Sequence, residues 1–200
     1  MSESRPLAAG SPAAGSLTTE PTRRQLTARQ ADTVRRLTEA GADEVREAGY
    51  ENLSIRDVAR RAGVAPATAY TYFASKDHLL SEIFWRRLSA LPPVGMTEPS
   101  ARARVVAVLR ELAMLVSGDP ELAAGCTAAL FGSDPDVRQL RLKIGLEIHR
   151  RIGAAAGAGN PAAGPLELAY FGAMVQAGLG YCTYGHMADR LAEAAALIMR

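Results

Sequence analysis

Cysteine is scarce in this chain of 200 residues, with only Cys126 and Cys182 present. The pair has no C-x-x-C spacing, and no histidine stands at zinc-site intervals, which argues against a structural metal and favours reduced thiols. No apolar run reaches the roughly 20 residues that span a bilayer, and residues 1–25 lack the apolar segment of a secretion signal. We therefore expect a cytoplasmic protein with no membrane association and no cofactor.

Catalytic motifs are missing as well. The sequence contains no G-x-S-x-G elbow, no phosphate-binding P-loop and no H-E-x-x-H pair. A thiol beside a histidine, such as Cys126 beside His149, would make a nucleophile, but nothing in the sequence fixes any such pair together. The glycine- and alanine-rich stretch 153–159 follows no strand and is interpreted as a flexible connection. These absences predict a protein that is not an enzyme.

Neither positive nor negative charge is in large excess. The net charge is +2, and the excess lies within residues 1–91. So small an excess does not identify a nucleic-acid-binding protein by itself. Hydrophobic residues make up 48% of the chain, which is enough for a sizeable core.

Helical periodicity is what the sequence does contain. Residues 1–22 are rich in Ser, Ala, Gly and Pro and are predicted to be a disordered tail. No later window shows strand alternation, so we predict an all-α fold of nine helices. The expected helices cover about 24–48, 54–62, 66–73, 76–91, 101–117, 121–131, 136–156, 166–184 and 187–200.

Single residues support the first of these boundaries. Gly49 is suited to end the first helix. Ser54 can cap the second helix, and Asp57 can reach back to it as the partner in a capping box. Pro66 suits the first position of the third helix, and Ser75 can cap the fourth.

The second and third expected helices have the residue sizes of a helix-turn-helix unit. Ala59 would let the two helices approach closely, and Gly63, four residues later, would supply a left-handed turn. The third helix starts with small residues, which would let its backbone and short side chains enter the major groove of DNA. This spacing alone is also common in ordinary helical hairpins.

The flanking residues make the pattern more specific. From about Thr33 to Trp85 the chain resembles the DNA-binding domain of the TetR family of transcriptional regulators, whose signature is similar to G(Y/F)xxTTxxxIAxxAGVSxGTLYxYFxSKExL. The matching stretch reads EAGYENLSIRDVARRAGVAPATAYTYFASKDHLLSEI. It departs from the signature at Ser54, Pro66 and Ala67, so an operator sequence cannot be transferred.

The resemblance implies a division of the chain and roles in DNA binding. The implied parts are a helix-turn-helix domain over 23–75 with its motif at about 54–73, a connecting helix over 76–91, and a ligand-binding and dimerisation domain over 92–200. Near the sugar-phosphate backbone would lie Ser54, Ile55 and Arg56. Facing the major groove would be Ala65, Pro66, Ala67, Thr68 and Thr71.

Phosphate contacts are implied for three further residues. Tyr70 and Tyr72 would reach phosphates, or one of them would pack while offering its hydroxyl, and Lys76 would clamp a phosphate. Arg60 and Arg61 would either face DNA or only solvate their helix. Few of these side chains can make bidentate base contacts, so we expect much of the specificity to come from threonine contacts, methyl contacts and DNA shape.

An effector pocket is expected among the fifth to eighth helices. Its candidate residues are mostly apolar, which predicts a hydrophobic or amphipathic small molecule. His149 would hydrogen-bond that molecule, or it is a surface histidine on a basic helix. The candidate lining residues are Leu112, Met114, Leu115, Cys126, Leu130, Phe131, Ile144, Ile148, His149, Tyr170, Phe171, Met174 and Tyr181.

A homodimer is expected because the stretch 167–184 is apolar on nearly all sides and rich in small residues. Such a helix must be buried on several faces, and a partner chain with two-fold symmetry would bury it together with the last helix. The candidate interface residues are Leu168, Gly172, Val175, Leu179, Leu191, Ala195 and Ile198.

These features together predict a repressor that binds double-stranded DNA as a dimer. Its two recognition helices would lie about 34–36 Å apart and match an inverted repeat. A small effector would change that spacing through the fourth helix, and DNA and effector would weaken each other's binding by the same factor. The alternatives left open are activation in place of repression, and a helical adaptor that uses the helix-turn-helix only as a scaffold for binding proteins.

Overall fold

The computed structural model describes residues 27–200, which form nine α-helices and one 3₁₀ helix, with no strand among them. The expected all-α fold is confirmed; the tail expected over 1–22 and the helix start expected near Arg24 lie outside these residues. No helix in this range is both long and apolar enough to cross a membrane. The elements are α1 (Ala28–Asn52), α2 (Ile55–Arg61), α3 (Pro66–Tyr72), α4 (Lys76–Ala90), α5 (Ala101–Met114), α6 (Pro120–Phe131), η1 (Pro135–Val137), α7 (Arg138–Ala156), α8 (Ala163–Gly178) and α9 (Tyr184–Ile198).

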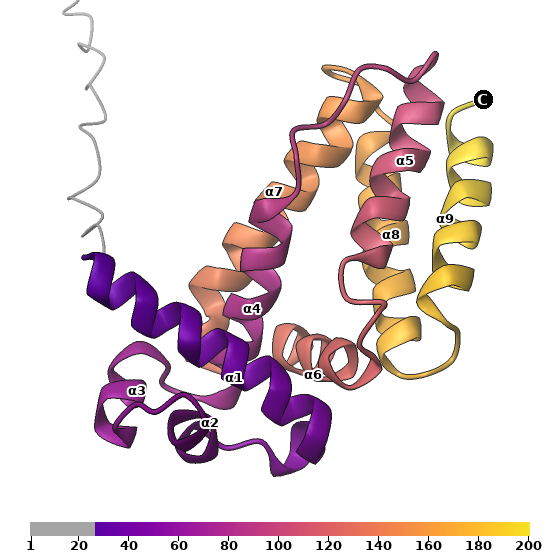
Figure 1. Ribbon diagram of the computed structural model, residues 1–200. Helices are drawn as coiled ribbons and strands as arrows, with labels where there is room; N and C mark the ends of the chain where they lie inside the picture. Colours follow the sequence, from indigo (N-terminus) through magenta and orange to yellow (C-terminus); the bar gives the residue numbers. More distant parts are fainter. Residues whose placement is uncertain (1–26) are drawn as a thin grey trace, which may run out of the picture.

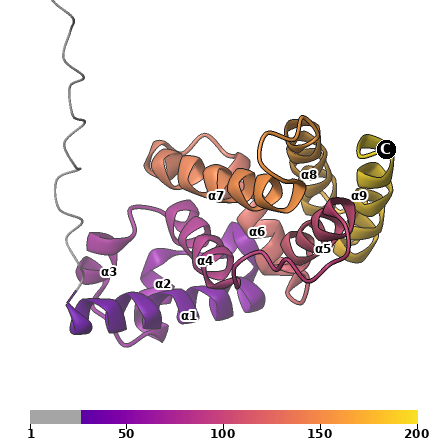
Figure 2. The same ribbon diagram turned by 90° about the horizontal axis from the view of Figure 1, so that it is seen from above.

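The helices form two parts that α4 connects (Figure 1). Helices α1, α2 and α3 lie together at one end, and α4 leads from them into the larger part. There α5, α8 and α9 run side by side, α7 packs against α4, α5 and α8, and α6 crosses below against α1 and α4. In the view from above, α6 lies between α4 and α8 (Figure 2). The position of α4 therefore couples the small end of the molecule to the large one.

Local residue chemistry sets the ends of α1. Thr27 and Gln30 form a capping box at its start, in which each side chain bonds the other residue's backbone N–H. Gly49 interrupts the helix with φ 76° and ψ 165°, a backbone conformation that glycine adopts without strain. One further turn then runs to Asn52, so Gly49 marks a kink and not the final end that we expected.

The helix-turn-helix forms as the sequence predicts. The Asp57 N–H donates to the Ser54 hydroxyl at 3.1 Å, and that hydroxyl donates to the Asp57 carboxylate, whereas the expected capping box would have bonded the carboxylate to the Ser54 N–H. Gly63 has φ 62°, and the Val64 N–H donates to the carbonyl of Ala59 at 2.9 Å. This turn sets α3 against α2.

Two glycines mark close helix contacts, one between α1 and α4 and one between α6 and α8 within the larger part. A β-carbon added at Gly41 would lie 2.7 Å from the Leu79 Cδ2 atom, so α1 and α4 cross closely there. A β-carbon at Gly178 would collide with Thr127, which places α8 directly on α6. One continuous core of buried side chains extends through both parts.

The later helix boundaries differ from the expected ones where the sequence is uniformly apolar. Helix α8 ends at Gly178, not at residue 184, because the chain turns through Gly180 with φ 78°. Helix α9 begins at Tyr184, where the hydroxyl of Thr183 accepts from the His186 N–H at 3.1 Å. Helix α5 ends at Met114, and a 3₁₀ turn precedes α7.

The C-terminal end of α4 is held by a buried cation. Arg151 on α7 is 2% exposed and donates to the carbonyls of Leu91 at 2.8 Å and Pro92 at 2.9 Å. It also bonds the carboxylate of Glu147 at 2.9 Å and lies 3.5 Å from that of Glu111. A cation at the C-terminus of a helix complements its dipole, so this end of α4 is firmly fixed.

Candidate DNA-binding surface and effector cavity

The outer face of α3 carries little bulk. Ala69 is fully buried beneath the helix and Phe73, just past its end, is 3% exposed, so these two residues anchor α3 to the core. No residue of α3 is charged. The exposed positions are Ala65, Pro66, Ala67, Thr68, Tyr70 and Thr71. The helix therefore presents backbone, methyl groups and hydroxyls to an opposing surface.

The two tyrosines of α3 lie in different surroundings. Tyr70 is 53% exposed, so its ring projects from the protein. Tyr72 is half-buried against the core and lines a groove together with Thr68 and the first turns of α1. Tyr70 is free to reach a phosphate, whereas Tyr72 packs.

The start of α2 offers fewer side chains to DNA than expected. Ile55 is only 4% exposed, so its side chain belongs to the core and only its backbone can contact DNA. Ser54 is half-buried, with its hydroxyl engaged by Asp57. Arg56 is exposed. Helical periodicity explains the difference, because successive residues of one turn cannot all face outward.

The adjacent arginines of α2, Arg60 and Arg61, make different contacts. Arg61 bonds the carboxylates of Glu44 and Glu47 on α1, and these contacts raise its pKa further and lower that of Glu47. It therefore fastens α2 to α1. Arg60 is 77% exposed and pairs with Asp57 at 2.8 Å within its own helix, so its charge faces solvent.

Lys76 holds the end of α1 in this structure. Its Nζ donates to the carbonyl of Tyr50 at 2.9 Å and to that of Glu51 at 3.2 Å, and it lies 4.2 Å from the centre of the Tyr50 ring. An ammonium has three N–H donors, so one remains for a phosphate. Its contact with DNA stays a prediction.

The first turns of α1 add a cation that sequence reasoning missed. Arg29 is exposed and lines the groove that Thr68 and Tyr72 also line. Arg36, in the same groove, donates to the carbonyl of Ala62 at 3.1 Å and so holds the turn of the motif. The T-x-x-Q spacing of the capping box could have located the start of α1. It would then have placed Arg29, in the first turn of that helix, beside α3.

A cavity of about 180 Å³ lies between α4, α6, α7 and α8. Seven of its lining residues were expected, namely Leu130, Phe131, Ile144, Ile148, Tyr170, Phe171 and Met174. Phe84, Arg141 and Gly145 were missed, although the spacing of positions 141, 144, 145 and 148 along one helix marks a shared face. The complete lining is Phe84, Leu130, Phe131, Arg141, Ile144, Gly145, Ile148, Tyr170, Phe171 and Met174.

Six expected pocket residues lie outside this cavity, among them Leu112, which is fully buried in the core, and Leu115, which is half-buried. Met114 is 46% exposed at the end of α5, and Tyr181 is 79% exposed in the turn before α9. Cys126 is fully buried in the core, and burial raises the pKa of its thiol to about 12. His149 is exposed and bonds Glu167 at 2.8 Å. Helix rotation, which apolar composition does not fix, separates these residues from the lining.

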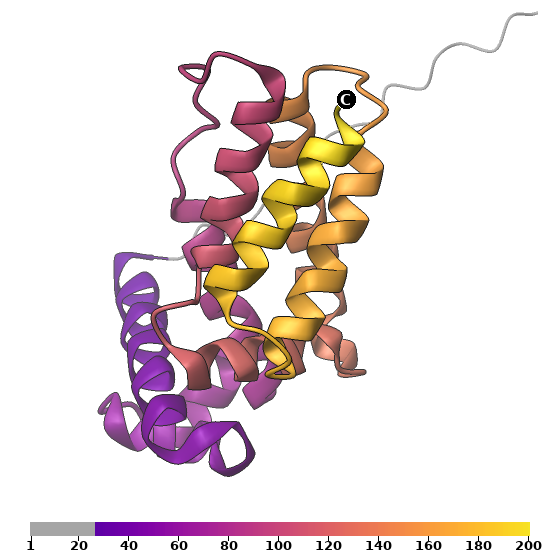
Figure 3. The same ribbon diagram turned by 90° about the vertical axis from the view of Figure 1, so that its right-hand side faces the viewer.

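The outer face of α8 and α9 is mostly apolar along α8 and is uncovered in the single chain, with Arg190 of α9 donating to Gln176 of α8 at 2.9 Å. Helices α8 and α9 lie side by side on it (Figure 3), and a groove of about 260 Å³ runs between them. Ala195 is buried against the rest of its own chain, so this expected interface residue does not lie on this face, whereas Leu191, although only 2% exposed, lines the groove. The expected residues that are exposed or half-exposed are Leu168, Gly172, Val175, Leu179 and Ile198.

Comparisons with known proteins agree with this geometry. The family described as "Bacterial regulatory proteins, tetR family" matches residues 37–83. An uncharacterized HTH-type transcriptional regulator of Mycobacterium tuberculosis is 47% identical over 178 residues, which cover 86% of this chain and 82% of that protein. A TetR transcriptional regulator from Rhodococcus sp. RHA1 has a similar structure, with TM-score 0.71, 21% identity and coverage of 86% and 98%. The transcriptional regulator FadR from Bacillus subtilis, solved in complex with stearoyl-CoA, follows with TM-score 0.54, 18% identity and coverage of 80% and 96%.

Proposed function

The chain belongs to the TetR family of helix-turn-helix transcriptional regulators, and we propose that it is a homodimeric repressor that a small amphipathic effector releases from a palindromic operator. One observation carries the proposal: only three residues separate the recognition helix α3 from α4, and Phe84 of α4 lines the cavity. A single rigid element therefore touches both the DNA-binding surface and the effector site. The proposed activity of the protein is binding and not catalysis.

DNA binding through α3 is tested by footprinting on the region upstream of the protein's own gene. We expect protection of an inverted repeat whose half-sites lie about 10 base pairs apart, or a multiple of that spacing. Tyr70→Ala removes an exposed ring from α3 and should abolish protection. Tyr181→Ala removes an even more exposed ring far from α3 and should leave protection unchanged.

Loss of protection in both tyrosine variants would show that either substitution disrupts DNA binding, wherever it lies. This result would count against α3 as the helix that contacts the operator. Protection without sequence preference, unchanged by Tyr70→Ala, would favour the adaptor, in which the helix-turn-helix is only a scaffold. A reporter gene under the protected promoter then distinguishes repression from activation by the sign of its response.

Dimerisation through α8 and α9 is supported by the spacing of the exposed residues on α8. Leu168, Gly172, Val175 and Leu179 follow each other at steps of four, three and four, which places them on one helix face. Glycine and alanine in the adjoining groove permit close approach of a partner helix. A two-fold interface would cover this stripe in both copies at once.

Sedimentation equilibrium tests this interface. Leu168→Glu places a charge in the proposed interface and should convert dimers to single chains. Leu146→Glu makes the same change on α7, where the leucine is 68% exposed compared with 76% for Leu168, and should leave the dimer intact. Dimers of equal strength in both variants would overturn the proposed interface.

The effector proposal rests on the cavity lining, which is apolar except for one guanidinium and one buried phenol. Such a lining binds hydrocarbon and excludes strongly hydrated molecules. The stearoyl-CoA seen with Bacillus subtilis FadR makes acyl chains reasonable first probes. Addition of a true effector should reduce operator binding, and the operator should reduce effector binding by the same factor.

A further inference from the structure

Arg141 is the one charged side chain on the cavity lining in the part of the chain that the structure describes. Its Nη1 donates to the carbonyl of Gly132 at 2.8 Å, and its Nη2 donates to the carbonyl of Asp134 at 2.7 Å. Both acceptors are neutral. A guanidinium has five N–H donors, so a full positive charge with free donors borders an otherwise apolar space.

The two carbonyls belong to the loop 132–134, which reaches the DNA-binding end of the molecule. The hydroxyl of Ser75 donates to the Asp134 carboxylate at 2.5 Å. Ser75 is the N-cap of α4 and stands three residues after the end of the recognition helix α3. A continuous set of contacts thus leads from the cavity through Arg141 and this loop to the α3–α4 junction.

Asp134 does not neutralise Arg141 by a direct ion pair. Its carboxylate accepts from the Ser75 hydroxyl and from the Asp136 N–H, at 2.8 Å for the latter. The Ser75 hydrogen bond is the main cause of its lowered pKa, and the charges of His78 and Arg141 contribute from a greater distance. The Asp134 carboxylate therefore stays ionised and hydrogen-bonded to Ser75 at the start of α4. The Arg141 guanidinium remains available to a ligand.

We propose, building on the effector function above, that the effector is an anionic amphipath whose acid group binds Arg141, and that this binding loosens the Ser75–Asp134 contact. The hydrocarbon part of the molecule occupies the apolar lining. The acid group draws the guanidinium away from the carbonyls of the loop 132–134. The loop then loses the two bonds that position Asp134 against the N-terminus of α4.

The bonds from the Arg141 guanidinium to the two carbonyls are charge-assisted on the donor side only, whereas an acid group adds a full negative charge and can accept two parallel bonds from the guanidinium. An acid group therefore outcompetes the Gly132 and Asp134 carbonyls for the Arg141 guanidinium. The apolar surroundings strengthen this attraction, because charges interact more strongly where water is excluded. A neutral molecule of the same length gains only the hydrophobic contribution, and a cationic one is repelled.

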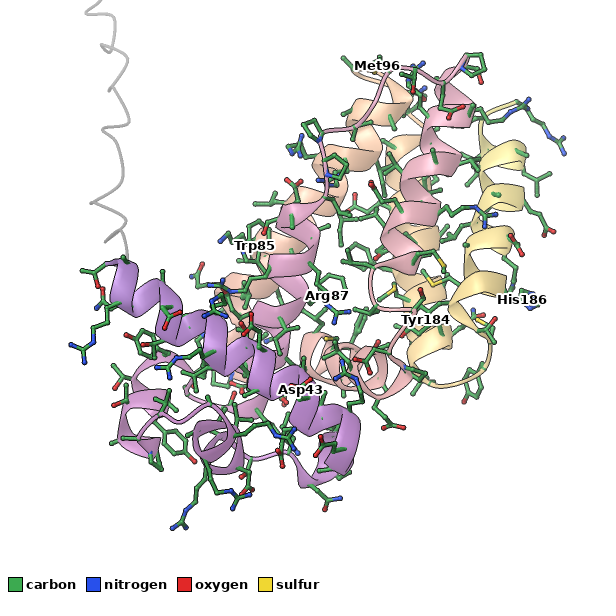
Figure 4. All side chains as sticks on the ribbon, in the orientation of Figure 1. Asp43, Trp85, Arg87, Met96, Tyr184 and His186 are labelled. Atoms are coloured by element: carbon green, nitrogen blue, oxygen red, sulfur yellow. The ribbon has the colours of Figure 1, made fainter. Side chains whose placement is uncertain are left out.

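The opposite end of α4 cannot follow this movement, because buried Arg151 holds it at Leu91 and Pro92. Trp85, the only tryptophan of the sequence, lies on α4 beside the lining residue Phe84, and the Lys143 Nζ sits 4.0 Å from the centre of its ring (Figure 4). Its fluorescence therefore reports on the contact between α4 and α7, the two helices that carry the lining residues Phe84 and Arg141.

The first experiment titrates the full chain with decanoate, decan-1-ol and decyltrimethylammonium while Trp85 fluorescence is recorded. We expect decanoate to bind at least tenfold more tightly than decan-1-ol, and the cation to bind most weakly. Arg141→Gln should bring decanoate and decan-1-ol to similar affinity. Arg138→Gln, which removes an exposed arginine from the start of the same helix, should keep the preference for decanoate.

Equal binding of decanoate and decan-1-ol by the wild-type chain would overturn the anionic class while leaving an apolar effector intact. A preference for decanoate that persists in Arg141→Gln, or that Arg138→Gln removes equally, would overturn the assignment to Arg141. Binding of none of the three probes would count against the cavity as the effector site and against the inference with it.

The second experiment measures hydrogen exchange of the segment 73–79 with and without decanoate. In the wild-type chain decanoate should speed exchange there severalfold, including at the His78 amide that Ser75 caps. Asp134→Ala should show the fast exchange already without decanoate, bind decanoate at least as tightly, and show no further change. Unchanged exchange in the wild-type chain at saturating decanoate, or an equal acceleration in Asp134→Ala, would overturn the proposed route to α4.

Discussion

Replacing Arg151 by methionine should destabilise the protein more than any exposed charge change. Methionine retains much of the side-chain length but leaves the carbonyls of Leu91 and Pro92 without this donor and removes one of the two arginines that bond the carboxylate of Glu147. Removing one partner of a buried ion pair costs about 3–5 kcal/mol. Glu147 keeps its second partner, Arg150, so we place the loss near the lower limit, at about 3 kcal/mol.

Urea denaturation followed by circular dichroism measures this loss as a change in the free energy of unfolding. The matched control is Arg150→Met, which removes a 58% exposed arginine from the same carboxylate. Exposed pairs contribute about 1 kcal/mol or less, so the control should change little. A loss below about 1 kcal/mol for Arg151→Met, or equal losses in both variants, would refute the claim that a buried cation fixes α4.

Three further changes have defined outcomes. Gly178→Ala should lower the free energy of unfolding by about 2 kcal/mol through overpacking against Thr127, and Thr127→Ala in the same chain should recover most of it in urea denaturation. Tyr170→Phe should leave stability unchanged or raise it by about 1 kcal/mol in the same assay, because the buried hydroxyl has no hydrogen-bond partner among residues 27–200. Asp134 has a pKa below its usual 3.8, so its stabilisation is complete above that value and is lost as pH falls through the lower native value; a pH series of urea midpoints should be flatter for Asp134→Asn.

The helix-turn-helix was predictable because its determinants are local. Gly63 adopts the positive φ that its spacing from Ala59 demanded, and Ser54 and Ser75 accept the N–H groups three residues on. Each of these features depends on residues within one helical turn. Tertiary context did not have to be known, and the expected motif formed with boundaries correct to within about two residues.

The cavity and the outer face were predicted only in part because they depend on helix rotation. Leu168 and Leu191 are equally apolar, yet one is 76% exposed and the other 2%, since α9 turns Leu191 toward its own chain. Arg141 was overlooked because a charged residue was not expected on an apolar lining. The apolar character of this half can be recognised from the sequence. The packing of four helices decides which of its residues meet.

The two ends of α4 are held with unequal strength, and this inequality determines where the molecule can move. Arg151 is buried and bonds α4 from within the core, whereas the Ser75–Asp134 contact is partly exposed. Fifteen residues at 1.5 Å each make α4 about 22 Å long, so a rotation of about 10° at the Arg151 end shifts the Ser75 end by about 4 Å. Half-sites on DNA are fixed about 34–36 Å apart. In the proposed dimer, a shift of this size would misalign the two recognition helices with their grooves.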